Sequence, residues 1–227
     1  MPSYRVNEST ISLNIYDIVG QDGNSHNFIV HTGLAESTGS HAAEQNIPVI
    51  DMSPPLREGN DLSDVSVVGS AFLTDDEERK IKKFIDTHAS EHEAFQQLRR
   101  KEFFKSIPQM YCVFPHAEKI KEKDGRYTRM RFSCVGFVFE AYKYAKIVLL
   151  VDTNDLPSLN MELIGQAYPR QLQMMESNHV KKEDLGLTGD GPWSVMLCGY
   201  LFHALNRTSN DIRTEPYTPH LEDQSFL

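Results

Sequence analysis

The sequence lacks the features of a membrane-spanning, secreted or disulfide-bonded protein. No apolar run approaches the roughly 18 residues that a membrane span needs. The start, MPSYRVNEST, has no basic segment followed by an apolar stretch, so we expect no signal peptide and a cytoplasmic location. Only three cysteines are present, at positions 112, 134 and 198. This odd and widely spaced set predicts free thiols, with neither a disulfide framework nor a CxxC metal site.

Basic charge is also scarce. Lysine and arginine number 23 against 32 acidic residues, for a net charge of −9. That balance argues against a general nucleic-acid-binding protein. Hydrophobic residues (40%) and charged residues (24%) occur at the frequencies of an ordinary globular protein, so a core can form. The 227 residues suit one domain, or one domain with a sizeable extension.

Strand patterns fill the first third of the chain and helical patterns follow. Alternation predicts strands over 11–19, 26–31, 47–52 and 65–72, with a long loop over 32–46. Thr74 and Glu77 form a capping box that predicts a helix start, and helical spacing predicts one or two helices over 75–101. We further expect a strand over 109–114, a hairpin turn at 123–126, helices over 133–145, 159–168 and 196–205, a strand or helical continuation over 146–151, a loop over 176–192, and a poorly ordered tail from Thr208.

Cys134 stands where the most apolar helix is expected to begin. A helix N-terminus favours a thiolate, the reactive form of cysteine, and Ser133 is a suitable N-cap. The backbone N–H of Cys134 is placed to serve an oxyanion hole, and Gly136 would let the helix approach neighbouring backbone closely. The alternative is an inert core thiol, because cysteine is among the most buried residue types. That inert interpretation is preferred for Cys112 and Cys198.

A reactive cysteine needs a base, and nine histidines are available. His26 opens a strand directly after a turn, so its ring is expected at the end of the sheet. His31, five residues on, is expected to face the opposite side of the sheet from His26. His88 and His92 lie one helical turn apart, a spacing that can bind a metal, but no third ligand is evident. A solvated face is preferred for them, and no metal or cofactor is expected.

A third group would orient the imidazole. Asp51 lies within a β-rich run between Ile50 and Met52, where a buried carboxylate would cost free energy unless it had a partner. The alternative is that Asp51 simply faces water. Glu36 and Glu44, in the predicted loop, are further candidates.

Residues 134–138 with 141–142, Cys-Val-Gly-Phe-Val then Ala-Tyr, resemble the nucleophile helix of NlpC-like peptidases. The best match to the histidine strand of that family is 25–30, preceded by 17–19, and it lies upstream of the cysteine. This inverted order is similar to that of the circularly permuted papain-like branch, which includes YiiX-like proteins and the lecithin:retinol acyltransferase relatives. Val49-Ile50-Asp51 matches its next strand, with Asp in place of Glu. The resemblance covers about residues 13–150.

The resemblance implies an α+β fold, with an antiparallel sheet packed against helices and the nucleophile at a helix N-terminus. Residues 1–151 would form the catalytic core and 152–227 an extension packed on it. Cys134 would be the nucleophile, His26 the base and Asp51 the orienting acid. The implied activity is a cysteine hydrolase acting on a peptide-like or amide substrate. A non-catalytic peptide- or lipid-binding module and a lipid acyltransferase or thioesterase remain alternatives, and the oligomeric state is open.

Two features depart from the family or leave the substrate open. Asn27 and Phe28 replace the small residue and the glycine that usually follow the histidine, and the segment between His26 and Asp51 is long. The stretch 117–131 carries six basic against three acidic residues just before the cysteine. It is either a surface that attracts an anionic substrate or a solvated hairpin.

Overall fold

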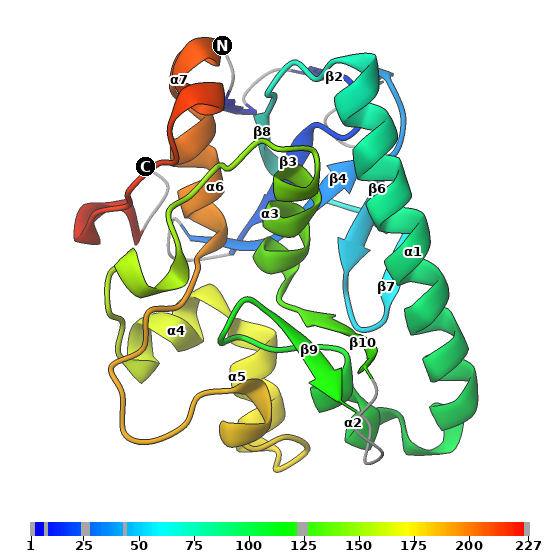
Figure 1. Cartoon of the computed structure of the whole chain (residues 1–227), viewed down its shortest axis with the longest axis vertical. Helices are drawn as coiled ribbons and strands as arrows, with labels where there is room; N and C mark the ends of the chain where they lie inside the picture. The colour runs from blue at the N-terminus through cyan, green and yellow to red at the C-terminus, as the bar shows by residue number, and fades with distance from the viewer. Residues whose placement is uncertain (1–2, 7–8, 24–27, 43–44, 122–126, 225–227) are drawn as a thin grey trace.

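The fold is α+β, and its centre is a six-stranded antiparallel sheet (Figure 1). The computed structural model describes residues 3–6, 9–23, 28–42, 45–121 and 127–224. In spatial order the strands are β1 (Ser3–Arg5), β8 (Val65–Gly69), β3 (Ile18–Asp22), β4 (Ile29–Ala35), β6 (Ile47–Met52) and β7 (Leu56–Leu62). The expected α+β class with an antiparallel sheet against helices is therefore confirmed.

Two smaller antiparallel pairs complete the strands: β2 (Thr10–Leu13) with β5 (Gly39–Ala42), and β9 (Ala117–Lys121) with β10 (Tyr127–Phe132). The single strand predicted over 11–19 is broken between β2 and β3, where Tyr16 adopts a positive φ of 60°. The pairing of β9 with β10 agrees with the predicted hairpin, whose turn at 123–126 lies outside the described residues.

The loop predicted over 32–46 is wrong, because β4 continues to Ala35 and β5 follows it. Thr32 and Gly33 belong to residue types that favour loops, but here they lie in the body of the sheet. Gly33 pairs with Asp51 of β6, and a Cβ on Gly33 would lie only 3.1 Å from the Cβ of Asp51. A glycine at this position lets the two strands pair without crowding Asp51, and the continuous strand makes His31 part of β4.

The helices are α1 (Asp75–Arg99), α2 (Phe103–Ser106), α3 (Cys134–Tyr144), α4 (Met161–Ala167), α5 (Pro169–Glu176), α6 (Cys198–Leu205) and α7 (Ser209–Thr214). The predicted capping box is present at the start of α1: Thr74 N–H donates to Glu77 Oε2 at 2.7 Å, and Glu77 N–H to Thr74 Oγ1 at 3.4 Å. The helices expected over 159–168 and 196–205 are confirmed as α4 and α6.

Helices α1, α3 and α6 lie on one face of the sheet, and the β2–β5 pair covers the other (Figure 1). Successive strand residues point to opposite faces, so Leu34 packs toward the helices and Ala35 toward β2 and β5. Phe202 of α6 belongs to the predicted extension over 152–227, and its ring packs on β3 at Gly20, which leaves room for it. Side chains from both sides of the predicted boundary at 151 thus share one core.

Three further predictions need correction. Residues 109–114 do not form a strand, because a 3-10 turn ends there and Tyr111 makes a single bridge to Phe132. Segment 146–151 is neither helix nor strand: Lys146 has a φ of 72°, which ends the helix. The tail from Thr208 is ordered as α7, since Arg213 donates to the Ala71 carbonyl at 2.8 Å and to Glu77 at 3.1 Å.

Two residues, Ser133 and Gly136, fix the position of the start of α3. Ser133 has extended backbone and its Oγ accepts the N–H of Gly136 at 2.9 Å, so the predicted N-cap is confirmed. A Cβ on Gly136 would lie 1.9 Å from the carbonyl oxygen of His116. The close approach expected of Gly136 is therefore present, and it seats the first turn of α3 directly against the chain before β9.

His92 is fully buried, so the expected solvated face is wrong for this residue. Its Nδ1 accepts the N–H of Leu56 at 3.1 Å, and its Nε2 donates to the carbonyl of Met130 at 2.8 Å. Both ring nitrogens are thereby committed to backbone groups. Within the described residues, no three histidine, cysteine or acidic side chains are grouped to hold a metal ion. In the same part of the chain, no helix is long and apolar enough to cross a membrane.

We predict that His92 makes the fold acid-sensitive. Burial lowers the pKa of His92 to about 4, from an ordinary 6.5. The unfolded chain therefore binds a proton that the folded chain does not, and stability should fall as the pH drops from 6.5 toward 4. The linkage corresponds to about 2 kcal/mol lost between pH 7 and pH 5. Urea unfolding at both pH values should show this loss in wild type and in His220→Gln, an exposed control, but not in His92→Gln. Equal pH dependence in all three would contradict the prediction.

We also predict that Gly136→Ala destabilises the protein by about 2 kcal/mol or more, because its methyl group meets a backbone carbonyl that has no room to move aside. Gly165→Ala in α4 is the matched control. There the added methyl meets only the flexible end of Leu172, so a small change is expected. Chemical denaturation of both variants measures the difference, and similar losses would show that the His116 contact is not the constraint.

Candidate active site

The candidate site lies where the first turn of α3 meets strands β4 and β6. Cys134 is the first residue of α3 and is 2% exposed. His31 of β4 and Asp51 of β6 come from adjacent strands, in which Gly33 is the direct partner of Asp51. His31 lies two residues before Gly33 on β4, so it is diagonal to Asp51 across the strand pair. The glycine leaves space across which the imidazole reaches the carboxylate.

Asp51 is held by three side chains. His31 Nε2 makes a very short contact with Asp51 Oδ2, to which Ser53 Oγ also donates at 2.6 Å. Asn60 Nδ2 donates to the other oxygen, Oδ1, at 3.0 Å. The Asp51 side chain has no exposed surface, whereas that of His31 is 18% exposed. The predicted Asp51 is thus a buried carboxylate that fixes a histidine, and not a residue facing water.

The histidine beside Asp51 is His31. The predicted base, His26, lies outside the described residues. His31 was expected to face the opposite side of the sheet from His26 because it lies five residues further on; β4 begins at Ile29 and includes His31. Of the other acid candidates, Glu36 accepts the N–H of Gly59 at 2.8 Å, and Glu44 lies outside the described residues. No local sequence signal marked His31, because the pairing of Gly33 with Asp51 becomes visible only in the structure.

The electrostatics favour a charged pair. A hydrogen bond from Cys198 holds the pKa of Cys134 well below its usual range; burial opposes this, and a hydrogen bond to His31 lowers it further. Burial alone would lower the pKa of His31, but hydrogen bonds with Asp51 and Cys134 outweigh it and raise that pKa to about 10. Because Nε2 contacts Asp51, Nδ1 is the ring nitrogen left for the sulfur. The arrangement stabilises a thiolate beside an imidazolium.

The other two thiols differ from Cys134. Burial raises the pKa of Cys112 to about 12, and its sulfur contacts the Pro115 carbonyl at 2.8 Å. The hydrogen bond to Cys134, together with burial, raises the pKa of Cys198. Cys134 is therefore the thiol favoured to ionise first.

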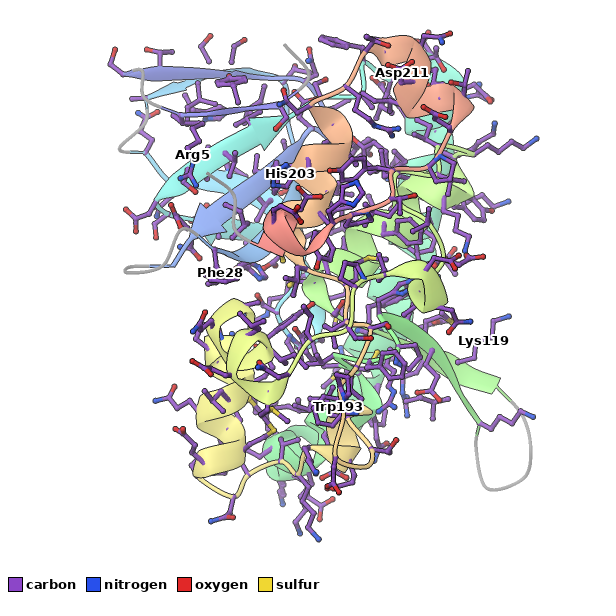
Figure 2. All side chains as sticks on the ribbon, turned by 90° about the vertical axis from the view of Figure 1, so that its left-hand side faces the viewer. Arg5, Phe28, Lys119, Trp193, His203 and Asp211 are labelled. Carbon is purple, nitrogen blue, oxygen red and sulfur yellow. The ribbon has the colours of Figure 1, made fainter. Side chains whose placement is uncertain are left out.

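A cavity of about 290 Å³ gives access to the site. Its walls include His31, Asp51, Cys134, Tyr111, Asn60 and Arg170. Tyr111 and Arg170 were not identified from the sequence, since they come from a short turn and from the start of α5. The basic stretch 117–131 contributes none of the described wall residues. Lys119 lies on the β9–β10 hairpin, which projects away from the sheet, and Arg131 pairs with Glu118 (Figure 2).

Comparison with protein-family models, with curated proteins and with solved structures found no match to this chain. The functional assignment therefore depends on the geometry of Cys134, His31 and Asp51.

Proposed function

We propose that the chain is a cysteine hydrolase of the thiol acyl-transfer type, with Cys134 as nucleophile, His31 as base and Asp51 as the residue that orients the imidazole. One observation carries the proposal: a buried carboxylate holds a histidine, and that histidine and a helix-N-terminal cysteine line the same cavity. The order of the three residues along the chain, histidine, acid and then cysteine, supports membership of the circularly permuted papain-like branch.

The chemistry would proceed in two stages. The Cys134 thiolate attacks the carbonyl carbon of an amide or ester, and a C–S bond forms while the negative charge moves to the carbonyl oxygen. The backbone N–H of Cys134, at the first turn of α3, and the hydroxyl of Tyr111, whose side chain lines the cavity, are the donors proposed for that oxyanion. The C–N or C–O bond then breaks, and the leaving group takes a proton from His31.

In the second stage the neutral imidazole of His31 removes a proton from a water molecule, which attacks the thioester carbon. The C–S bond breaks, the acid product leaves, and Cys134 returns to the thiolate while His31 holds the proton. Asp51 keeps Nε2 of His31 engaged throughout, so Nδ1 stays directed to the sulfur. A peptide-like or amide substrate is the first candidate for this site.

One observation favours a second candidate, a lipid acyltransferase or thioesterase. A larger cavity of about 710 Å³ adjoins the first and shares Gln21, Val30 and Pro169 with it. Phe28, at the edge of the sheet nearest α4, and Leu172 of α5 make part of its wall apolar (Figure 2), while Asp22, Asp64 and Glu162 line the rest with acidic groups. An acyl chain lying along the apolar part of this wall would bring its carbonyl carbon toward Cys134, since the two cavities share wall residues.

The first test separates the two histidines. Iodoacetamide should alkylate Cys134 rapidly at about pH 6, well below the range where an ordinary thiol of pKa about 8.5 reacts, because the thiolate is stabilised. His31→Ala should lose this fast phase, and His26→Ala should keep it. Peptide mass spectrometry assigns the label to each cysteine. Loss of the fast phase in His26→Ala with its retention in His31→Ala would transfer the role of base to His26.

The second test concerns acyl transfer itself. Incubation with p-nitrophenyl acetate should release a burst of nitrophenol and leave an acetyl group on Cys134, detected by mass spectrometry. Cys134→Ala should show neither, and Cys112→Ser, a change at a buried thiol outside the cavity, should behave as wild type. If no acyl group accumulates or turns over on Cys134, the non-catalytic binding module becomes the better description.

A further inference from the structure

A second cysteine faces the candidate nucleophile. Cys198, the first residue of α6, places its sulfur 3.5 Å from the sulfur of Cys134. The two residues are 64 positions apart in sequence and are brought together because α3 and α6 begin at the same place against the sheet. Both are buried, at 2% and 1% exposure. A disulfide between them would need the sulfurs to approach by about 1.5 Å.

The surroundings favour negative charge on this sulfur pair. Each cysteine is the first residue of a helix, so the positive ends of two helix dipoles lie beside this sulfur pair. The thiol of Cys198 can donate to the thiolate of Cys134 across the 3.5 Å separation. A thiol held against a thiolate is the arrangement from which thiol–disulfide chemistry proceeds, because the second sulfur is already in position to attack.

The cavity imposes an order of events. Cys134 is part of the cavity wall, whereas Cys198 is not among the described residues that line it. A small oxidant that enters the cavity therefore meets Cys134 first. Cys112 offers no comparable arrangement, since its sulfur contacts the carbonyls of Pro115 and Arg131.

We propose that Cys134 and Cys198 form a reversible disulfide, in which Cys198 resolves a peroxide-oxidised Cys134. The Cys134 thiolate attacks one oxygen of a hydroperoxide such as hydrogen peroxide: an S–O bond forms, the O–O bond breaks, and the hydroxide that leaves takes a proton to become water. Cys198 then loses its proton and attacks the sulfur of Cys134. The S–S bond forms as the S–O bond breaks, and a second water leaves. Two thiols are oxidised by two electrons and one peroxide is reduced.

The disulfide would silence the site, because the attacking sulfur is no longer a thiolate. It would also protect that sulfur, since sulfenic acid that is not resolved is oxidised further to sulfinic acid, which ordinary thiols do not reduce. A dithiol would restore both cysteines. The silencing rests on the proposed function, whereas the formation of the disulfide does not.

The experiment treats the full chain with a small molar excess of hydrogen peroxide and maps its cysteines by peptide mass spectrometry, before and after dithiothreitol. Wild type and the matched control Cys112→Ser should show a Cys134–Cys198 linkage that dithiothreitol removes. Cys198→Ser should instead accumulate sulfinic acid on Cys134 that dithiothreitol leaves in place. Cys198→Ala gives the same comparison of products if the serine variant is unstable, with slower oxidation expected because alanine lacks the hydrogen bond to Cys134.

Activity measured in parallel separates the two proposals. Reversible loss of p-nitrophenyl acetate turnover in wild type, with irreversible loss in Cys198→Ser, is the result expected if both proposals hold. A reversible linkage in a protein that never turns over the ester would uphold the disulfide and overturn the hydrolase. Two results would overturn the disulfide whatever the activity shows. In one, Cys134 of the wild type is oxidised to sulfinic acid as readily as in Cys198→Ser. In the other, Cys134 does not react with peroxide at all.

Discussion

Asp51 is a carboxylate with no exposed surface near the end of strand β6, and the rest of the site depends on how the fold accommodates it. A buried, uncompensated charge of this kind costs several kcal/mol. The fold compensates it with donors from three places: His31 on the neighbouring strand, Ser53 at the end of its own strand, and Asn60 on β7. These bonds lower the pKa of Asp51 against the opposing effect of burial. The carboxylate therefore stays charged, and it holds the imidazole in a fixed orientation and a charged state.

The parts of this arrangement that were predictable from sequence are local. Ser133, Cys134 and Gly136 are consecutive features of one helix start, and the physics of capping and close approach acts within a few residues. The capping box of α1 was recognised for the same reason. Asp51 was identified because an acid in an apolar strand is costly wherever the strand lies.

The parts that were missed depend on pairing across the fold. Thr32 and Gly33 belong to loop-forming residue types, and only their register against β6 shows them to be sheet residues that carry His31 into the interior. The sequence predicted an inert core thiol at Cys198, because nothing near this residue in the chain reveals that α6 begins beside α3. Arg213 gave no local sign of pinning α7 to the start of α1, more than a hundred residues away. Long-range contacts of this kind leave no periodic signal in the chain.

The close contact between Gly136 and the His116 carbonyl has a consequence for recognising relatives of this protein. A relative without the proposed activity would be free to replace Cys134, since many small side chains fit a helix N-terminus. It would not be free to replace Gly136, because any side chain there collides with the backbone at His116 whether or not the site is active. The glycine two positions after Cys134 is therefore the residue that relatives are most expected to keep. Searches for distant or degenerate relatives should require that glycine, rather than the cysteine, next to a serine N-cap.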